Sequence, residues 1–151
     1  MKLTKKGEYS LKALLALTST YGQKPLHLHE ISSQENIPYK FLEQIMILLR
    51  RSGLVTSVKG KNGGYVLSKQ PSQTTLGEII RAIEGPLAPI GTAAEIREKM
   101  DKDERHAGLY SVLLDVRNAV SKILDQKTLA DVYEKTLEAS LAKSHYQMYY
   151  I

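Results

Sequence analysis

The segment from Pro38 to Leu67 constrains the fold more than any other part of the chain. Its first half has the periodicity of a helix that begins at Pro38 and ends near Ser52, with Gly53 as a left-handed stop. Apolar residues gather on one side of this helix, at Phe41, Leu42, Ile45, Leu48 and Leu49. The opposite side carries Lys40, Glu43, Gln44, Ile47 and Arg51. We therefore expect one face to pack against a core and the other to stay available for a partner.

The second half of the segment predicts a hairpin over residues 54–67, rich in valine, with a loop that contains three glycines and two lysines. Lys59 and Lys61 flank Gly60, and Asn62-Gly63 is an ordinary hairpin turn signal. The turn residues alone indicate nothing more than a hairpin. A polar-faced helix followed at once by a basic hairpin, however, is typical of winged helix-turn-helix domains, in which the helix enters the DNA major groove and the wing lies on the backbone.

Two helices are predicted before this segment. The first runs from Lys6 to Tyr21, with Thr4 as a possible cap. Its residues at helical spacing, expected to face the core, are Ala13, Leu14, Leu17 and Tyr21. The second is a short helix over residues 28–34 with Leu28 and Ile31 directed inward. The second of these helices and the helix that begins at Pro38 form the helix pair directly before the hairpin.

The chain after the hairpin predicts a linker over residues 71–75, a helix from Leu76 to Glu84, and an irregular segment over residues 86–105. A long helix follows from Ala107 to Leu124, and its apolar stripe is too long for the preceding domain to cover, so we expect a second copy to cover it. The expected dimer contacts are Leu109, Val112, Leu113, Val116, Val120 and Ile123. A last helix begins near Thr128, with Thr128 and Asp131 spaced as a capping box, and continues to about Lys143.

These elements divide the chain into a DNA-binding domain over residues 1–85, a sensor or connector loop over 86–105, and a dimerisation part over 106–151. The expected fold class is mainly α with a small β-wing.

Positive charge follows the same division. Residues 1–85 hold 12 Lys and Arg against 6 Asp and Glu, a net +6, whereas residues 86–151 hold 9 against 10, a net −1, which together give the chain's +5.

Composition excludes several functions. The chain has no cysteine, so disulfides, thiolate metal sites and cysteine nucleophiles are excluded. It has no nucleophile elbow and no phosphate loop, and therefore gives little support to an enzyme. No apolar run is long enough to cross a bilayer and no export signal is evident, so we expect a cytoplasmic protein with no membrane partner.

Individual side chains fit base and backbone recognition. Gln44 suits adenine, Glu43 can accept from the cytosine amino group, and Lys40 can reach guanine or phosphate. Lys5, Lys6 and Tyr9 can clamp a phosphate at the first helix, although a solvated basic terminus is an equal alternative. His27 and His29 are expected to be surface histidines, and His145 is expected to pack among the tyrosines of the tail.

Several motifs carry a family resemblance: residues 1–9, Phe41-Leu42-Glu43-Gln44, residues 53–60, Gly63-Gly64-Tyr65 and Glu84-Gly85-Pro86. In this order they resemble the IscR-like family of bacterial winged-helix transcription factors, whose type member regulates iron–sulfur cluster assembly. The resemblance implies a homodimer that crosses on the long helix and binds a two-fold-related operator. It places Tyr39, Lys40, Glu43 and Gln44 at the major groove, and Lys59 where the family often has a minor-groove arginine. The full expected set of DNA contacts is Lys5, Lys6, Tyr9, Tyr39, Lys40, Glu43, Gln44, Lys59, Lys61, Asn62 and Tyr65.

The chain departs from this family in one respect. Many members hold a cluster through three cysteines after the Glu-Gly-Pro turn, and residues 86–105 contain none. His106 resembles the family's non-cysteine ligand, and beside Asp103 it is a weak candidate for a metal or a pH sensor. We therefore expect no iron–sulfur cofactor. The expected function is a dimeric transcription regulator that acts as a repressor. The alternatives are a protein-interaction module or a sensor of a metabolite or a partner enzyme.

Overall fold

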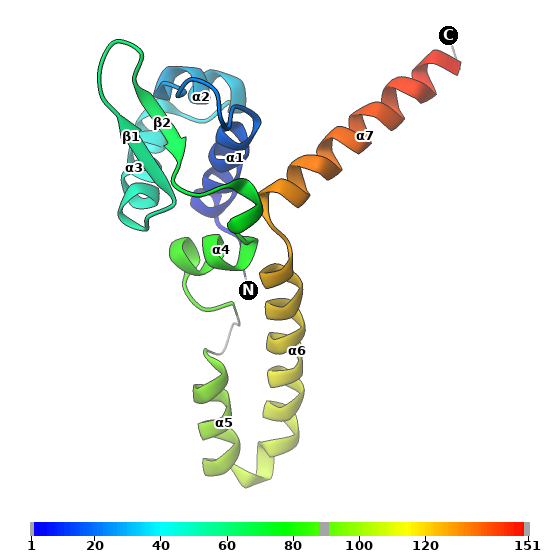
Figure 1. Ribbon diagram of the computed structural model, residues 1–151. Helices are drawn as coiled ribbons and strands as arrows, with labels where there is room; N and C mark the ends of the chain where they lie inside the picture. The colour runs from blue at the N-terminus through cyan, green and yellow to red at the C-terminus, as the bar shows by residue number, and fades with distance from the viewer. Residues whose placement is uncertain (1, 88–90, 150–151) are drawn as a thin grey trace.

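The structure is a computed structural model that describes residues 2–87 and 91–149. It confirms a mainly helical chain with one small antiparallel sheet (Figure 1). The elements in order are α1 (Lys5–Ser19), α2 (Leu28–Glu35), α3 (Tyr39–Arg51), β1 (Val55–Val58), β2 (Gly64–Leu67), a 3₁₀ turn (Pro71–Gln73), α4 (Leu76–Glu84), α5 (Ala93–Lys102), a second 3₁₀ turn (Glu104–His106), α6 (Ala107–Gln126) and α7 (Leu129–Tyr149).

The core lies among α1, α2, α3, α4 and the two strands, with the first residue of α7 added to it. Ala13, Leu14 and Leu17 of α1 are buried as the periodicity predicts, and Ile31 of α2 meets them in the same core. The prediction for Tyr21 is wrong, because α1 ends at Ser19 and the tyrosine side chain is 45% exposed. Thr4 caps α1 as expected, its hydroxyl accepting from the backbone N–H of Gly7 at 3.1 Å.

Helix α3 separates its faces as its sequence predicts. Leu42, Ile45 and Leu49 are fully buried, and Phe41 and Leu48 pack partly against the same core. Two boundaries differ slightly from the prediction. Pro38 is the N-cap of α3 and not its first helical residue, and Arg51 is the last helical residue. Gly53 has a φ of 74°, the left-handed conformation expected for a residue that turns the chain out of a helix.

The two strands pair from Val55 opposite Leu67 to Val58 opposite Gly64. The segment before α2 extends this hairpin. The backbone N–H of Tyr65 donates to the carbonyl of Leu26 at 2.8 Å, and the N–H of Leu26 donates to the carbonyl of Tyr65 at 3.2 Å. At Gly64 a Cβ would lie 2.4 Å from the Leu26 carbonyl oxygen, so only glycine permits this approach. The loop end of the strand ladder is thereby fixed next to the beginning of α2.

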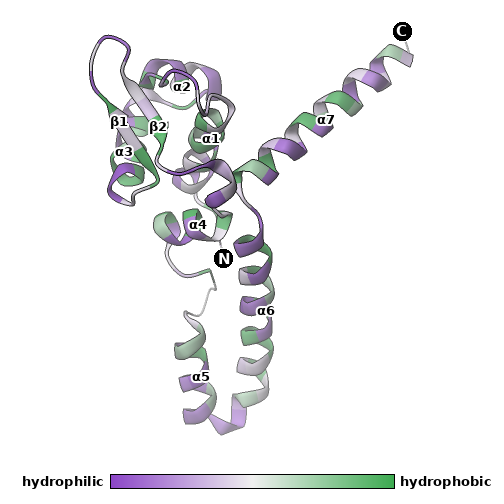
Figure 2. Ribbon diagram, in the orientation of Figure 1, coloured by the Kyte–Doolittle hydropathy of each residue, from purple (hydrophilic) through white to green (hydrophobic). Residues whose placement is uncertain are grey.

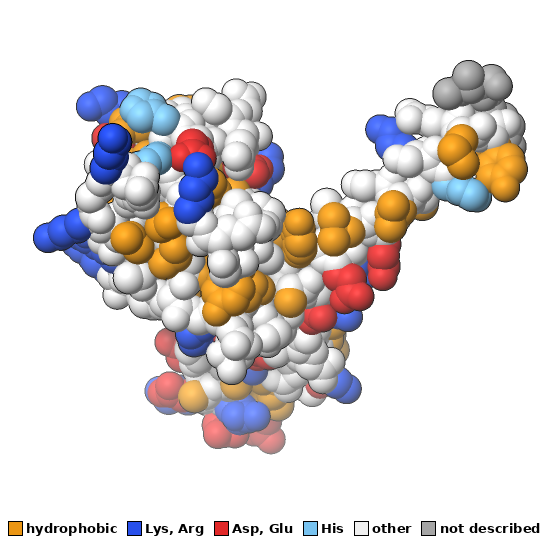
Figure 3. Space-filling model, turned by 45° about the horizontal axis from the view of Figure 1, so that its top comes forward, with side chains coloured by type: hydrophobic (Ala, Val, Ile, Leu, Met, Phe, Trp, Pro, Cys, Tyr) orange, Lys and Arg blue, Asp and Glu red, His pale blue; other side chains and the backbone are white. Residues whose placement is uncertain are grey.

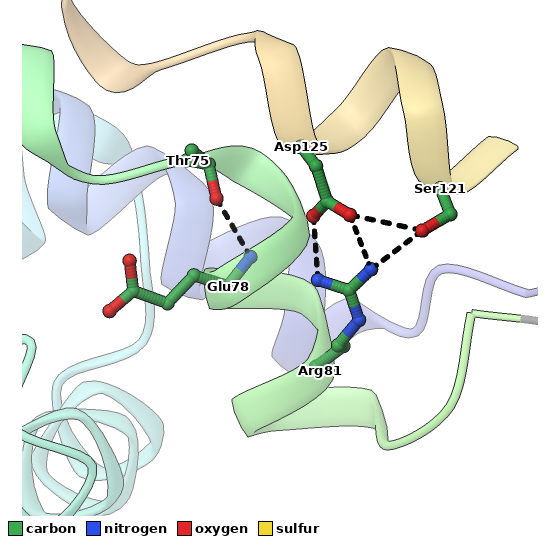
Figure 4. Close-up of polar contacts among 5 residues, drawn as sticks. All are labelled: Thr75, Glu78, Arg81, Ser121 and Asp125. Carbon is green, nitrogen blue, oxygen red and sulfur yellow. Dashed lines mark hydrogen bonds and ion pairs between the residues drawn. The ribbon is translucent and has the colours of Figure 1, made fainter. Parts of the chain in front are cut away.

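A polar cluster joins the winged-helix part to α6 (Figure 4). The guanidinium of Arg81 on α4 donates to both carboxylate oxygens of Asp125 at 2.6 and 2.8 Å, and to the hydroxyl of Ser121 at 2.9 Å. The hydrogen bonds from Arg81 hold the pKa of Asp125 below its ordinary value of 3.8. This bidentate pair sets the direction in which the long helix leaves the domain.

Residues 86–105 are not an irregular segment as predicted, because they contain α5. Thr92 and Glu95 form a capping box at its start, and Ile96 is fully buried. Helices α5 and α6 pack together as a hairpin, and hydrophobic residues recur along α6 (Figure 2). Residues 88–90 lie outside the described residues.

Helix α7 begins with the predicted capping box, since the carboxylate of Asp131 accepts from the N–H of Thr128 at 2.9 Å and the reciprocal bond is 3.1 Å. It runs beyond Lys143 to Tyr149 and projects away from the rest of the chain (Figure 1). His145 packs against Tyr149 of the tail as predicted, with the ring centres 4.7 Å apart. Tyr150 and Ile151 of the predicted aromatic tail lie outside the described residues.

Candidate nucleic-acid interface

The outer face of α3 carries the polar side chains that the sequence singled out. Lys40 and Gln44 are exposed, whereas Tyr39 and Glu43 are half-buried. Ile47 continues the same face and is 37% exposed. Since the opposite face is sealed into the core, this row of side chains is what α3 presents to a partner.

The wing presents the second group of candidates. Lys59, Lys61 and Asn62 are exposed at the turn between β1 and β2. The turn closes on a hydrogen bond from the backbone N–H of Gly63 to the carbonyl of Gly60, 3.0 Å long. Tyr65 is half-buried on β2, where its backbone pairs with Leu26. The structure therefore brings Lys59, Lys61 and Asn62 together at the tip, with Tyr65 nearer the base.

The N-terminal candidates contact α3 through an aromatic pair. The ring of Tyr9 meets Phe41 edge-on, with 5.5 Å between ring centres. The ammonium of Lys5 lies 5.6 Å from the Tyr9 ring and 3.4 Å from the Glu8 carboxylate. Hydrogen bonding to Lys12 and the charge of Lys5 lower the pKa of Glu8, which therefore stays ionised and offsets part of this positive charge. Lys6 is exposed.

Sequence reasoning missed one contact beside Tyr39. The imidazole of His29 on α2 stacks on the Tyr39 ring, with 4.4 Å between centres and 20° between planes. The His27-Leu28-His29 pattern had indicated only surface histidines. No periodicity predicts this contact, because it joins two helices across the tight connection between them.

Basic side chains surround these elements. Lys and Arg side chains project from the winged-helix part, with histidines among them. In the lower part of the molecule acidic and basic side chains are mixed, and acidic side chains lie along α7 (Figure 3). This distribution agrees with the net +6 of residues 1–85. A basic surface that includes a polar helix face and a glycine-rich wing is suited to double-stranded DNA.

Comparison with known proteins gives the family. Residues 3–135 match the Rrf2 family, described as an iron-dependent transcriptional regulator. The chain belongs to the Rrf2 family. It is accordingly a DNA-binding transcriptional regulator of the CymR and IscR type and not an enzyme.

Rrf2 relatives align over most of the chain. The regulator CymR of Bacillus subtilis is 36% identical over 136 residues, which cover 90% of this chain and 92% of CymR. IscR of Serratia proteamaculans is 32% identical over 132 residues, covering 87% and 79%. Among solved structures, the cysteine regulator CymR of B. subtilis has a TM-score of 0.73 at 35% identity, covering 89% of this chain and 98% of that one. T. potens IscR has a TM-score of 0.71 at 32% identity, covering 92% and 90%.

The iron dependence in the Rrf2 description does not fit the residues of this chain. The sequence has no cysteine to hold a cluster. His106 pairs through Nδ1 with the Asp103 carboxylate at 2.9 Å, but no group of three or more His, Asp or Glu that could hold a metal gathers within residues 2–87 and 91–149.

In the same described part of the chain, no helix is long and apolar enough to span a membrane.

The Rrf2 chain also presents an apolar row on α6. The exposed fractions are 55% for Leu109, 59% for Val112, 50% for Val116 and 60% for Ile123. With the exposed Ala119, these residues alternate spacings of three and four, the heptad pattern of a two-helix seam. Leu113 and Val120, also predicted at the dimer contact, are half-buried beside this row.

Proposed function

We propose that this Rrf2 regulator binds a two-fold-related DNA operator as a homodimer, with α3 of each copy in the major groove and the wing on the backbone. The observation that carries this proposal is the polar face of α3, which is held outward by a buried opposite face and is followed directly by the basic wing. Glu43 and Gln44 then read base edges, while Lys59 and Lys61 neutralise phosphates.

The dimer forms along α6. The row Leu109, Val112, Val116, Ala119 and Ile123 is an unbroken heptad seam that a single chain leaves in solvent. Burial of these side chains against their counterparts stabilises the dimer by the hydrophobic effect. A two-fold axis along such a seam relates two copies of α3, as a palindromic operator requires.

This dimer acts in the cytoplasm, as a repressor. When it is bound to a promoter, it excludes the polymerase from that promoter without any further contact. Its activity responds to a small molecule or a partner enzyme at residues 86–105 and not to an iron–sulfur cluster. An open cavity of about 530 Å³ in the α5–α6 hairpin, lined by Glu95, Lys99, Asp103 and Tyr110, supports the small-molecule effector.

Genes of cysteine metabolism are the first candidates for its targets. This inference is supported by the 35% identity to the cysteine regulator of B. subtilis, which aligns over 98% of its length. Genome-wide recovery of bound DNA fragments tests it. Enrichment of promoters for sulfur amino-acid genes supports the inference, and their absence among the recovered fragments refutes it.

The salt dependence of DNA binding tests the contact with the wing. Each phosphate contact adds about 0.9 to the slope of log affinity against log salt. Lys59→Ala with Lys61→Ala should therefore lower the slope by about 1–2, whereas the same change at Lys135 and Lys143 on α7 should leave it unaltered. An unaltered slope in the wing variant would mean that the wing is not on the backbone. A protein without salt-dependent binding to any duplex would favour the alternative of a protein-interaction module.

A further inference from the structure

A groove of about 340 Å³ lies between α2, the first residue of α3 and the wing. Its hydrogen-bonding side chains are His27 and His29 from the start of α2, Tyr39 from α3, and Ser57 and Tyr65 from the two strands. The other lining residues are aliphatic or glycine, so no Asp, Glu, Lys or Arg is among them. The lining thus combines imidazoles and hydroxyls, which are donors suited to an anion.

The geometry of the groove is fixed on both sides. The paired backbones of Leu26 and Tyr65 hold the start of α2 beside the wing. The stacked rings of His29 and Tyr39 hold the same part of α2 beside α3. Both imidazoles are exposed, whereas Tyr39, Ser57 and Tyr65 are half-buried. Ligand groups therefore meet the histidines at a preformed opening.

On the proposed function, the groove lies directly under the path of the DNA backbone. Tyr39 begins the helix assigned to the major groove, and Tyr65 belongs to the wing assigned to the backbone. A strand that passes from one to the other would cross the groove, whose lining includes both tyrosines. We propose that this groove seats one backbone phosphate of the operator, held by His27 and His29, so that protonation of these imidazoles strengthens DNA binding.

The pH range in which DNA binding should change depends on the ionisable groups on the elements around the groove. The charged ones are Glu30 and Glu35 on α2, Lys40, Glu43, Arg50 and Arg51 on α3, and Lys59 and Lys61 on the wing loop. The carboxylate of Glu30 accepts a hydrogen bond from the backbone N–H of His27 at 3.3 Å. Carboxylates, ammonium groups and guanidinium groups ordinarily keep their charge between pH 6 and 8, whereas imidazole changes its charge there. A pH effect in this range therefore reports the histidines.

Affinity for a mixed-sequence duplex, measured against salt at pH 6 and at pH 8, tests the proposal. Neutralising one phosphate adds about 0.9 to the salt slope, so the native protein should show a slope steeper at pH 6 by about 1. His27→Gln with His29→Gln should abolish the difference. His106→Gln with His145→Gln, which changes the two histidines away from the groove, should retain it. An equal native slope at both pH values, or a difference that survives the groove substitution, would overturn the proposal.

Two further measurements separate charge from structure. His29→Phe keeps an aromatic ring on Tyr39 but cannot be protonated, so it should lose its share of the slope difference between pH 6 and pH 8. In the native protein, NMR titration should show His27 and His29 gaining their protons at higher pH with the duplex bound. Unmoved titrations refute the phosphate seat. Salt-dependent binding at pH 8 without any pH effect rejects this inference alone and leaves the proposed function intact.

Discussion

Glu43 is the side chain on α3 whose charge opposes DNA. It is half-buried on a face that otherwise carries Lys40 and Gln44, and phosphates repel its carboxylate. An acidic group gains from this position when it accepts a hydrogen bond from a base, and cytosine offers the amino donor in the major groove. Glu43 is therefore expected to contribute to base preference more than to affinity.

Glu43→Ala should lower discrimination at one operator position by about 1–3 kcal/mol, while total affinity for unrelated duplexes stays equal or rises. Competition binding with operators substituted at single positions measures this. Glu138→Ala on the exposed arm of α7 removes the same charge without a base contact and should leave the preference intact. Equal weakening on every sequence would show that Glu43 does not read a base.

Sequence reasoning succeeded for residues whose neighbours lie within one helix. The faces of α3 follow from repeated spacing of three and four residues, and the cap of α1 follows from a threonine before a helical pattern. It failed for Tyr21, where the pattern was extended past the end of the helix at Ser19. It also missed the stacked pair of His29 and Tyr39, since that contact depends on the angle between two helices.

At the scale of elements, the joint between α4 and α6 determines how the DNA-binding part meets the long helix. Arg81, Ser121 and Asp125 form this joint. No residue spacing predicted the cluster, because Arg81 lies 40 positions from Ser121 and 44 from Asp125. The sequence analysis also missed helix α5. Its charged sequence was read as a loop, whereas the capping box at Thr92 and the buried Ile96 stabilise a helix against α6.

The carboxylate of Asp125 makes this joint sensitive to acid. Because Arg81 lowers the folded-state pKa of Asp125, the pair contributes stability above the ordinary value of 3.8 and loses it as the pH falls through the lowered value. Both side chains are partly exposed, so the contribution at pH 7 is about 1 kcal/mol. Asp125→Asn should lower the free energy of unfolding by that amount at pH 7 and by much less at pH 2.

Urea denaturation at fixed protein concentration measures both free energies of unfolding. Asp115→Asn, the same change at an exposed position of α6, should have little effect at either pH. A loss for Asp125→Asn that is as large at pH 2 as at pH 7 would mean that packing and not the ion pair accounts for the stability of the joint.

At the scale of the whole molecule, two parts of the chain are exposed because no other element of the same copy covers them. The heptad row on α6 is the first, and the projecting arm of α7 is the second (Figure 1). The periodicity of the long helix predicted the first, because apolar residues without a covering element indicate a partner helix. The sequence did not predict the reach of α7, whose last helical residue lies beyond the expected end at Lys143.

Val116→Asp should abolish the proposed dimer, because it would place an unpaired charge at the centre of the proposed α6 seam. Light scattering at micromolar concentration should then report the mass of one chain. Val58→Asp, the same substitution at an exposed residue of the wing, should leave the dimer unchanged. A Val116→Asp protein that remains dimeric would place the interface elsewhere.

Hydroxyl-radical footprinting on a recovered promoter fragment tests whether two copies present their α3 helices to one duplex. The account predicts two protected patches on the same side of the duplex, related by a two-fold axis, with centres about 10 base pairs or a multiple of that apart. A single patch at saturation, or two patches in the same orientation, would contradict it.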